Sequence, residues 1–421
     1  MTRALRTSAI TALAATSLAL TSCSGSALQQ ASGSSDASGE AVEEVVIGAL
    51  HPLSGASAAD GQAMEAAAQM AVEAVNDAGG IASLGGAELV LASADTQGKA
   101  EVGQSEATRL VQEGAAALIG TYQSAVSSNV ASVAERNQVP FVIDVSNLDA
   151  ILDQGYTYTF RIQPNASAMG AQGADSLIAM SAAAGTPVRK VAFLHEQGNF
   201  GQATLAAFEA EAEAQGVQVD PVISYDATSV SDMTTQLQQV AASGADVLAV
   251  AGYYRDSLLV SQAVQTIQPA GLNAVYGVAN GAYDQPQFLT DAPAGGAGYF
   301  DANYHWDVSD PRAQELAARF EQEQGEPIRT SAVEAYDAVM LIADALQEAG
   351  STDGAAVRDA LRASDYDPLV VNDGPVSFGE DGENENAAIV VMQVQDGAVE
   401  QVFPEALAES APVYPAPPVT P

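Results

Sequence analysis

Side chains that could carry out catalysis are few and scattered in this sequence. It has one cysteine and three histidines far apart, which excludes an internal disulfide framework and a cysteine-rich metal site. His195-Glu196 begins like a zinc-protease helix motif, but no second histidine follows at the required spacing. No nucleophile elbow, phosphate-binding loop or dinucleotide fingerprint follows a predicted strand. We therefore expect a binding protein without metal or other cofactor, although acid pairs among the 53 Asp and Glu residues leave acid–base catalysis open.

The single cysteine, Cys23, ends a segment typical of a secretory signal. A basic leader precedes an apolar run over residues 9–20, which is too short to remain as a membrane span. Leu20-Thr-Ser-Cys23 resembles the lipobox of bacterial lipoproteins, in which the cysteine sulfur is acylated and cleavage makes it the first residue. Ordinary cleavage that leaves a free thiol is the alternative. We expect a signal peptide over 1–22, a lipid on Cys23, and a flexible tether over 23–44 that is poor in bulky apolar residues.

The charge of the chain restricts its partners. Its 53 acidic and 14 basic residues give a formal net charge of −39. Nucleic-acid binding depends on cationic contacts to phosphate, so we expect no nucleic-acid partner. Anionic lipid headgroups would also repel this surface, and membrane attachment is therefore expected only through the lipid on Cys23.

Short apolar strands alternate with helical patterns in two similar series. The first series has strands at 45–50, 88–93, 115–120 and 140–145, with helices at 61–76, 100–113 and 125–136. The second has strands at 191–195, 217–224, 246–251 and 273–278, with helices at 201–215, 232–243 and 256–268. Helices at 332–349 and 355–363 and a strand at 389–394 are expected to complete both lobes. This order predicts an α/β fold with two doubly wound parallel-sheet lobes.

The candidate binding residues follow these strands directly. In open parallel sheets, ligands bind beyond the carboxyl ends of the strands, where successive loops converge. Hydroxyl, amide and aromatic groups at these positions suit a small polar solute. The candidates are Asp60, Tyr122, Gln123, Ser124, Ser146 and Asn147 from the first series, and Phe200, Tyr253 and Asn280 from the second. Alternatives remain open: Asp60 and Ser124 could cap helices, and Phe200 and Tyr253 could pack within a lobe.

Several short motifs, in order along the chain, resemble one family. They are Pro52-Leu-Ser-Gly55, Asn76-Asp-Ala-Gly-Gly-Ile81, Asn199-Phe-Gly201, Gly252-Tyr-Tyr254, Ala335-Tyr-Asp-Ala338 and Gly374-Pro-Val-Ser-Phe378. Together they are similar to type I periplasmic solute-binding proteins, the leucine/isoleucine/valine-binding group of ABC importers. The resemblance extends from Val45 to about Pro404.

This resemblance implies two lobes joined by three crossovers, which close on a solute by a hinge motion. It places 45–162 and 298–368 in the first lobe and 163–297 and 369–408 in the second, followed by a proline-rich tail over 409–421 that we expect to be frayed. The implied protein is a monomer that passes its solute to ABC permease and ATPase subunits.

The resemblance also assigns roles to the candidate residues. Ser124 and the Ser146-Asn147 pair match positions that hold an amino acid's carboxylate and ammonium groups, and Phe200 and Tyr253 match aromatic walls. Asn280 falls near the acidic residue that pairs with the ammonium group.

Three departures from the family pattern bear on the solute. Asp60 stands where an aromatic residue is common, Ser331 is near an apolar wall position, and Asn280 carries no charge. A branched-chain amino acid prefers an apolar cage, so these residues favour a more polar solute that carries an amine or amide. Asp60 could then meet a cationic group of that solute.

The sequence therefore predicts an extracytoplasmic receptor, anchored by lipid to the outer face of the cell membrane, that delivers a small polar solute to an ABC permease. A lipoprotein that senses a ligand and signals to a membrane partner is the alternative. No output module is visible in the sequence, which favours transport.

Overall fold

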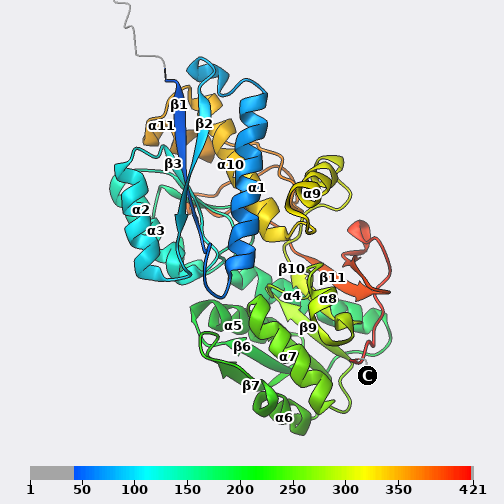
Figure 1. Cartoon of the computed structure of the whole chain (residues 1–421). Helices are drawn as coiled ribbons and strands as arrows, with labels where there is room; N and C mark the ends of the chain where they lie inside the picture. Colours follow the sequence, from blue (N-terminus) through cyan, green and yellow to red (C-terminus); the bar gives the residue numbers. More distant parts are fainter. Residues whose placement is uncertain (1–41, 419–421) are drawn as a thin grey trace, which may run out of the picture. The chain divides into compact units, whose positions relative to one another are not determined.

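The computed structural model describes residues 42–418 and contains two β-sheets. Cys23, the predicted signal peptide and nearly all of the predicted tether lie outside the described residues. Figure 1 shows one sheet with the blue, cyan and orange parts of the chain and the other with the green and red parts. We call the five-stranded sheet with its helices the first lobe, and the seven-stranded sheet with its helices the second lobe.

The first lobe is a parallel sheet in the order β2-β1-β3-β4-β5. Its strands are β1 (Glu44–His51), β2 (Glu88–Asp95), β3 (Ala117–Gly120), β4 (Phe141–Ile143) and β5 (Thr159–Arg161). Its helices are α1 (Ala58–Asp77), α2 (Ala100–Gln112), α3 (Ser124–Asn137), α9 (Pro311–Gln324), α10 (Thr330–Ala349) and α11 (Gly354–Arg362). The central strands are buried on both faces, because α1 and α10 pack on one face and α2 and α3 on the other (Figure 1).

The second lobe is a mixed sheet in the order β12-β11-β10-β9-β8-β6-β7. Its strands are β6 (Lys190–Glu196), β7 (Gln218–Tyr225), β8 (Val247–Ala251), β9 (Ala274–Val278), β10 (Phe300–Asn303), β11 (Val390–Gln395) and β12 (Ala398–Phe403). Its helices are α4 (Ala166–Ala183), α5 (Asn199–Ala214), α6 (Thr234–Ser243), α7 (Tyr254–Ile267) and α8 (Phe288–Asp291). All neighbouring pairs are parallel except β10–β11 and β11–β12, and α4 and α5 pack on the face opposite α6 and α7.

The predicted fold of two doubly wound lobes is confirmed, and its strands and helices lie close to their predicted bounds. The elements that the sequence analysis did not predict are β5, α4, α8, β10, α9 and β12. Four short 3₁₀ turns complete the described chain, at Ala82–Leu84, Asp149–Ile151, Pro293–Gly296 and Glu405–Leu407.

Within residues 42–418 the chain passes between the lobes three times, but two of the crossovers lie later than predicted. Phe300 pairs with Tyr276 of β9, so the crossover follows β10 and does not lie at residue 298. Leu369 lies in the core of the first lobe and Phe378 packs on Phe160 with ring centroids 4.9 Å apart. The chain therefore returns to the second lobe shortly before Ile389 and not at residue 369.

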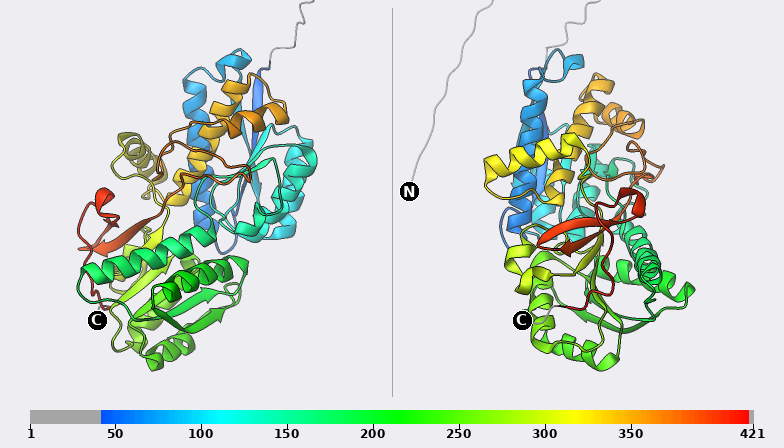
Figure 2. Two further views of the ribbon diagram at one scale, coloured as in Figure 1. Left: turned by 180° about the vertical axis from the view of Figure 1, so that it is seen from behind. Right: turned by 90° about the vertical axis from the view of Figure 1, so that its right-hand side faces the viewer.

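The proline-rich tail is packed, against the expectation that it frays. Tyr414 is buried and its ring lies 6.3 Å from that of Phe300. The backbone of Val413 exchanges two hydrogen bonds with the side chain of Gln393, and the Ala416 N–H donates to the carbonyl of Asn273 at 2.7 Å. The tail thus lies along the second sheet, and the red end of the ribbon is beside that lobe in both views of Figure 2.

None of the helices in the described part of the chain is long and apolar enough to cross a membrane.

Candidate functional site

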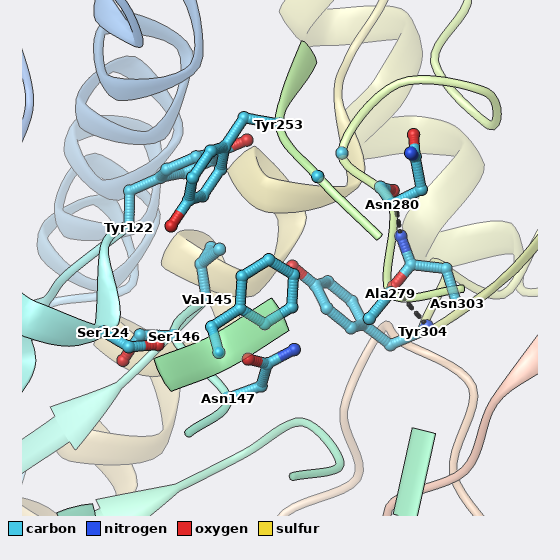
Figure 3. A pocket seen from close by; sticks show the side chains of 13 residues that line it. Tyr122, Ser124, Val145, Ser146, Asn147, Tyr253, Ala279, Asn280, Asn303 and Tyr304 are labelled. Atoms are coloured by element: carbon cyan, nitrogen blue, oxygen red, sulfur yellow. Dashed lines mark hydrogen bonds between the residues drawn. The ribbon is translucent and has the colours of Figure 1, made fainter. Parts of the chain in front are cut away.

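A pocket is lined by residues of both lobes (Figure 3). The first lobe contributes Tyr122, Ser124, Val145, Ser146 and Asn147, and the second contributes Phe200, Gly252, Tyr253, Ala279, Asn280, Gly281, Asn303 and Tyr304. These residues follow the carboxyl ends of β3, β4, β6, β8, β9 and β10. The site is therefore at the position that the topology of parallel sheets favours for ligands.

Aromatic rings form one wall of the pocket. Tyr253 of the second lobe lies between Tyr122 of the first lobe, with ring centroids 6.1 Å apart, and Phe200, at 5.7 Å. Burial raises the pKa of both tyrosine hydroxyls, so they stay neutral and can donate or accept a hydrogen bond at ordinary pH. The wall can thus contact a flat or apolar group while offering hydroxyls at its edge.

The first lobe presents polar groups on another side of the pocket (Figure 3). Ser124 is the first residue of α3, where the earliest amides have no partner within a helix. The amides of Val126 and Ser127 already bond to the carbonyl of Gln123, which leaves the N–H groups of Ser124 and Ala125 at the start of the helix. This helix end can receive an anionic group of a ligand.

Ser146 and Asn147 follow β4 and are held by contacts beneath the pocket. The Ser146 hydroxyl bonds to that of Ser127, and its carbonyl accepts a hydrogen bond from Gln163 at 2.9 Å. The Asn147 amide nitrogen donates to the sulfur of Met169 at 3.2 Å, and a thioether is a weak acceptor. A better acceptor on a ligand could therefore compete for this amide.

Asn280 lines the pocket mainly through its backbone. Its amide nitrogen donates to the Ser257 hydroxyl at 2.9 Å and to the Val250 carbonyl at 3.3 Å, and its amide oxygen accepts from Ala282 N–H at 2.9 Å. In Figure 3 its side chain turns away from the other labelled side chains. Asn280 is thus close to the pocket as predicted, but its amide is engaged inside the second lobe.

Asp60 and Gln123 do not line the pocket. Asp60 is buried and its Oδ1 lies 3.3 Å from Nη1 of Arg329, so its partner is a cation of the protein. Burial raises the pKa of Asp60 to about 6 although Arg329 opposes this shift. The N-cap of α1 is Ser57, so Asp60 does not cap that helix either. Gln123 donates from its amide nitrogen to the Ser57 hydroxyl at 3.0 Å.

Ser331 is also outside the pocket. It is buried on α10, and its hydroxyl has no hydrogen-bond partner among the described residues. Two of the three departures that favoured an amine-bearing solute, Asp60 and Ser331, therefore do not touch this pocket, and the third, Asn280, has its side chain turned away.

Several lining residues were missed by the sequence analysis. Tyr304 and Asn303 follow β10, and the strand-end rule would have found them had this short strand been recognised. Asn303 donates to the carbonyl of Asn280 at 2.8 Å and accepts from the Tyr304 N–H at 3.0 Å, which fixes this loop. Gly281 lies so close to the Tyr122 hydroxyl that a Cβ would be 2.9 Å from its oxygen. This small residue lets Tyr122 reach across to the second lobe.

In the described part of the chain, no three His, Cys, Asp or Glu side chains are grouped so that they could hold a metal ion. The side chains that line the pocket offer hydrogen bonding and ring contact.

Comparisons with known proteins agree with this geometry. Residues 44–398 match the family described as periplasmic binding protein. A relative from Brucella suis, named Leu/Ile/Val-binding protein homolog 8, is 28% identical over 384 residues, which cover 88% of this chain and 93% of the relative.

Two solved structures show the same fold. A leucine-binding protein, LivK, from Thermotoga maritima has a TM-score of 0.73 and 22% identity, over 85% of this chain and 97% of that chain. A solute-binding protein of an ABC transporter from R. palustris, crystallised with benzoate, has a TM-score of 0.74 and 19% identity. The match covers 90% of this chain and 98% of that chain.

The named relatives are solute-binding proteins and not enzymes, which confirms the expectation of a binding protein. Because the match covers most of the chain and the two-lobed fold agrees with it, the chain belongs to the type I periplasmic binding proteins, the solute-binding components of ABC importers of the branched-chain amino acid type.

Proposed function

We propose that this chain captures a small polar solute, such as an amino acid, an amide or a related compound, between its two lobes and delivers it to an ABC permease with its ATPase subunits. The carrying observation is the pocket itself, because loops at the strand ends of both lobes bring polar groups and aromatic rings to one place. In this proposal Ser124, Ser146 and Asn147 hold a polar end of the solute, while Phe200 and Tyr253 cover its body. The family implies an extracytoplasmic location, where such a receptor meets its solute.

A thermal-shift screen with amino acids, amides, urea, polyamines and small carboxylates tests the capture of a solute. A compound that binds only the folded protein raises its unfolding midpoint. If no compound in the panel shifts the midpoint, and mass spectrometry of the denatured protein releases no co-purified solute, the proposal is contradicted.

Replacing Ser124 by alanine tests the polar end of the pocket. Losing a hydrogen bond to a buried ligand group costs about 1–3 kcal/mol. Ser124→Ala should therefore lower the affinity for the best-binding solute by roughly 5- to 150-fold in calorimetric titration. The matched control is Ser128→Ala, one turn further along α3, where the hydroxyl bonds to the helix carbonyl of Ser124 at 3.0 Å. Equal affinities for the two variants would show that Ser124 does not contact the solute.

We also propose that Cys23 carries the lipid that holds the protein at the outer face of the membrane as a monomer. The support is the sequence pattern before this single cysteine. Cys23→Ser should release the protein from the membrane fraction or leave its precursor unprocessed, as seen by fractionation and gel mobility. Unchanged membrane association and processing would refute the lipid anchor.

A further inference from the structure

The pocket contains no charged side chain. Its thirteen lining residues include no Asp, Glu, Lys, Arg or His. The lining groups that can ionise are tyrosine hydroxyls, whose pKa burial raises, as it does for Tyr304. A charged group of a solute would therefore meet dipoles but no opposite charge on a lining side chain.

Two carboxylates near the aromatic wall, Asp256 and Glu196, have partners in the protein. Two others near Tyr304, Asp284 and Glu334, do not line the pocket, and burial raises their pKa, to about 7 for Asp284. Asp256 accepts from the N–H of Tyr253 at 3.1 Å and from the hydroxyl of Tyr225, at the start of α7. Glu196 accepts from the N–H groups of Gly198 and Gly201, at 2.6 and 2.8 Å, at the start of α5. Neither residue lines the pocket.

An ammonium group would therefore be poorly accommodated. Removing a cation from water into a buried site is unfavourable unless an opposite charge and hydrogen-bond acceptors replace the water. Here no carboxylate lines the pocket, the side chain of Asn280 is engaged elsewhere, and Asp60 is paired with Arg329.

A carboxylate would be better placed than an ammonium group. The N-terminus of the 14-residue helix α3 opens at Ser124, a residue that is only 7% exposed and lines the pocket. The amide of Asn147, whose hydrogen bond goes to a thioether, lies beside it and can donate to the same group. A helix N-terminus with two such donors stabilises an anion.

The other side of the pocket favours a flat apolar body. Four aromatic residues line it, namely Tyr122, Phe200, Tyr253 and Tyr304. Rings at centroid distances of about 4.5–7 Å attract one another in tilted arrangements, and a ring of the solute would extend the existing series.

From this charge pattern we infer that the solute is an aromatic monocarboxylate without an ammonium group, and not an α-amino acid. The inference rests on the proposed capture of a solute between the lobes, and it replaces the amino acid named there by a carboxylate without an ammonium group. The carboxylate lies against Ser124 and Asn147 of the first lobe, and the ring lies among the aromatic side chains.

Calorimetric titration with matched pairs of compounds tests the inference. L-phenylalanine and 3-phenylpropanoate differ by the α-ammonium group alone, and so do L-leucine and 4-methylpentanoate. We expect each carboxylate to bind about tenfold or more tighter than its amino acid, and 3-phenylpropanoate to bind tighter than 4-methylpentanoate. Equal or tighter binding of the amino acids overturns the inference.

A pair of variants at Ala279 gives an independent readout. This residue lines the pocket with a φ of +50°, a conformation that Asp and Asn adopt more readily than most residues. Ala279→Asp adds a carboxylate that should shift preference toward L-phenylalanine by about tenfold relative to Ala279→Asn, its uncharged control of equal size. The same preference in both variants would contradict the inference.

Failure of this inference differs from failure of the proposed function. If neither pair binds but a cationic or amine-bearing compound of the thermal-shift panel does, the aromatic monocarboxylate is wrong and the receptor function stands. If nothing binds and no solute co-purifies, both are wrong.

Discussion

His51 is a buried residue whose charge depends on two neighbouring carboxylates. It is fully buried, with Nδ1 2.9 Å from a carboxylate oxygen of Glu65 and Nε2 3.0 Å from one of Asp144. Burial alone lowers the pKa of His51, but the hydrogen bonds and charges of Asp144 and Glu65 raise it, to about 9. The ring therefore stays protonated at neutral pH inside the first lobe.

This shift predicts a loss of stability in alkali. The pKa of His51 in the folded protein is above the usual value of about 6.5. The stability that its protonated ring contributes is therefore fully present below pH 6.5 and is lost as pH rises through 9. The free energy of unfolding should fall by about 3 kcal/mol over that window, measured by urea denaturation. His51→Gln should remove this fall.

His305 is the matched control, because burial lowers its pKa to about 4 and it stays neutral throughout the window. His305→Gln should keep the same pH dependence as the unaltered protein. If His51→Gln shows the same fall in the free energy of unfolding, a group other than His51 titrates in this pH range.

Some residue roles could be predicted from the sequence because they depend on local position. Ser124, Asn147 and Tyr253 line the pocket because each follows a strand end, and strand ends are readable from the apolar pattern. The ion pair of Asp60 could not be predicted in this way. Its partner, Arg329, is 269 residues away, and no local pattern indicates that the two meet.

At the scale of elements, close packing of α4 on α5 depends on Gly170. A Cβ at this position would lie 2.4 Å from the carbonyl oxygen of Thr204 and 3.0 Å from Cβ of Ala207. Gly170→Ala gains about 1 kcal/mol of helix propensity, but overpacking against a backbone carbonyl costs about 1–3 kcal/mol.

We therefore expect Gly170→Ala to lower the free energy of unfolding by up to about 2 kcal/mol in urea denaturation. Ser167→Ala, on the exposed side of the same helix, should change it by less than about 0.5 kcal/mol. Unchanged or increased stability of Gly170→Ala would mean that the two helices can separate without loss.

The elements that escaped prediction lack the usual apolar pattern. β10 is only four residues long, and its sequence Phe-Asp-Ala-Asn includes buried polar groups. The helix α9 was recognisable in principle, because Asp310 caps it and Pro311 opens it, which is a common helix start. The long apolar elements such as α10 were predicted because their periodicity is unambiguous.

At the scale of the whole molecule, contacts outside the pocket lining also join the two lobes. The guanidinium of Arg329, in the first lobe, lies 5.4 Å from the ring centroid of Tyr254, in the second. The Gln287 amide donates to the carbonyl of Pro327 at 3.0 Å. Binding of a solute between lobes should favour arrangements in which such contacts are made.

Tyr254→Ala should therefore lower the affinity for the best-binding solute by roughly 2- to 5-fold, since a cation–π contact is worth about 0.5–1 kcal/mol. Tyr254→Phe keeps the ring and loses only the bond to Asp291, so it should bind normally. Small-angle scattering should show a smaller radius of gyration with solute for the unaltered protein and a smaller decrease for Tyr254→Ala. An unchanged radius under saturating solute would contradict hinge closure.

The family resemblance predicted the number of crossovers, but two of the three lie later in the chain than it placed them. Phe378 and Leu369 belong to the first lobe because Leu369 lies in its core and Phe378 packs against that core. Where a chain leaves one lobe is decided by which core its side chains enter, and that depends on tertiary contacts.

The three crossovers also set the order in which the protein can mature on the ribosome. The strands of the first lobe are synthesised long before α10 and α11, which cover one face of their sheet, and the second lobe waits for β11 and β12. Neither lobe is complete until the C-terminal part of the chain has been translated. The signal peptide predicted over 1–22 would require an unfolded chain at the membrane, and this interleaved topology delays folding for as long as translation continues.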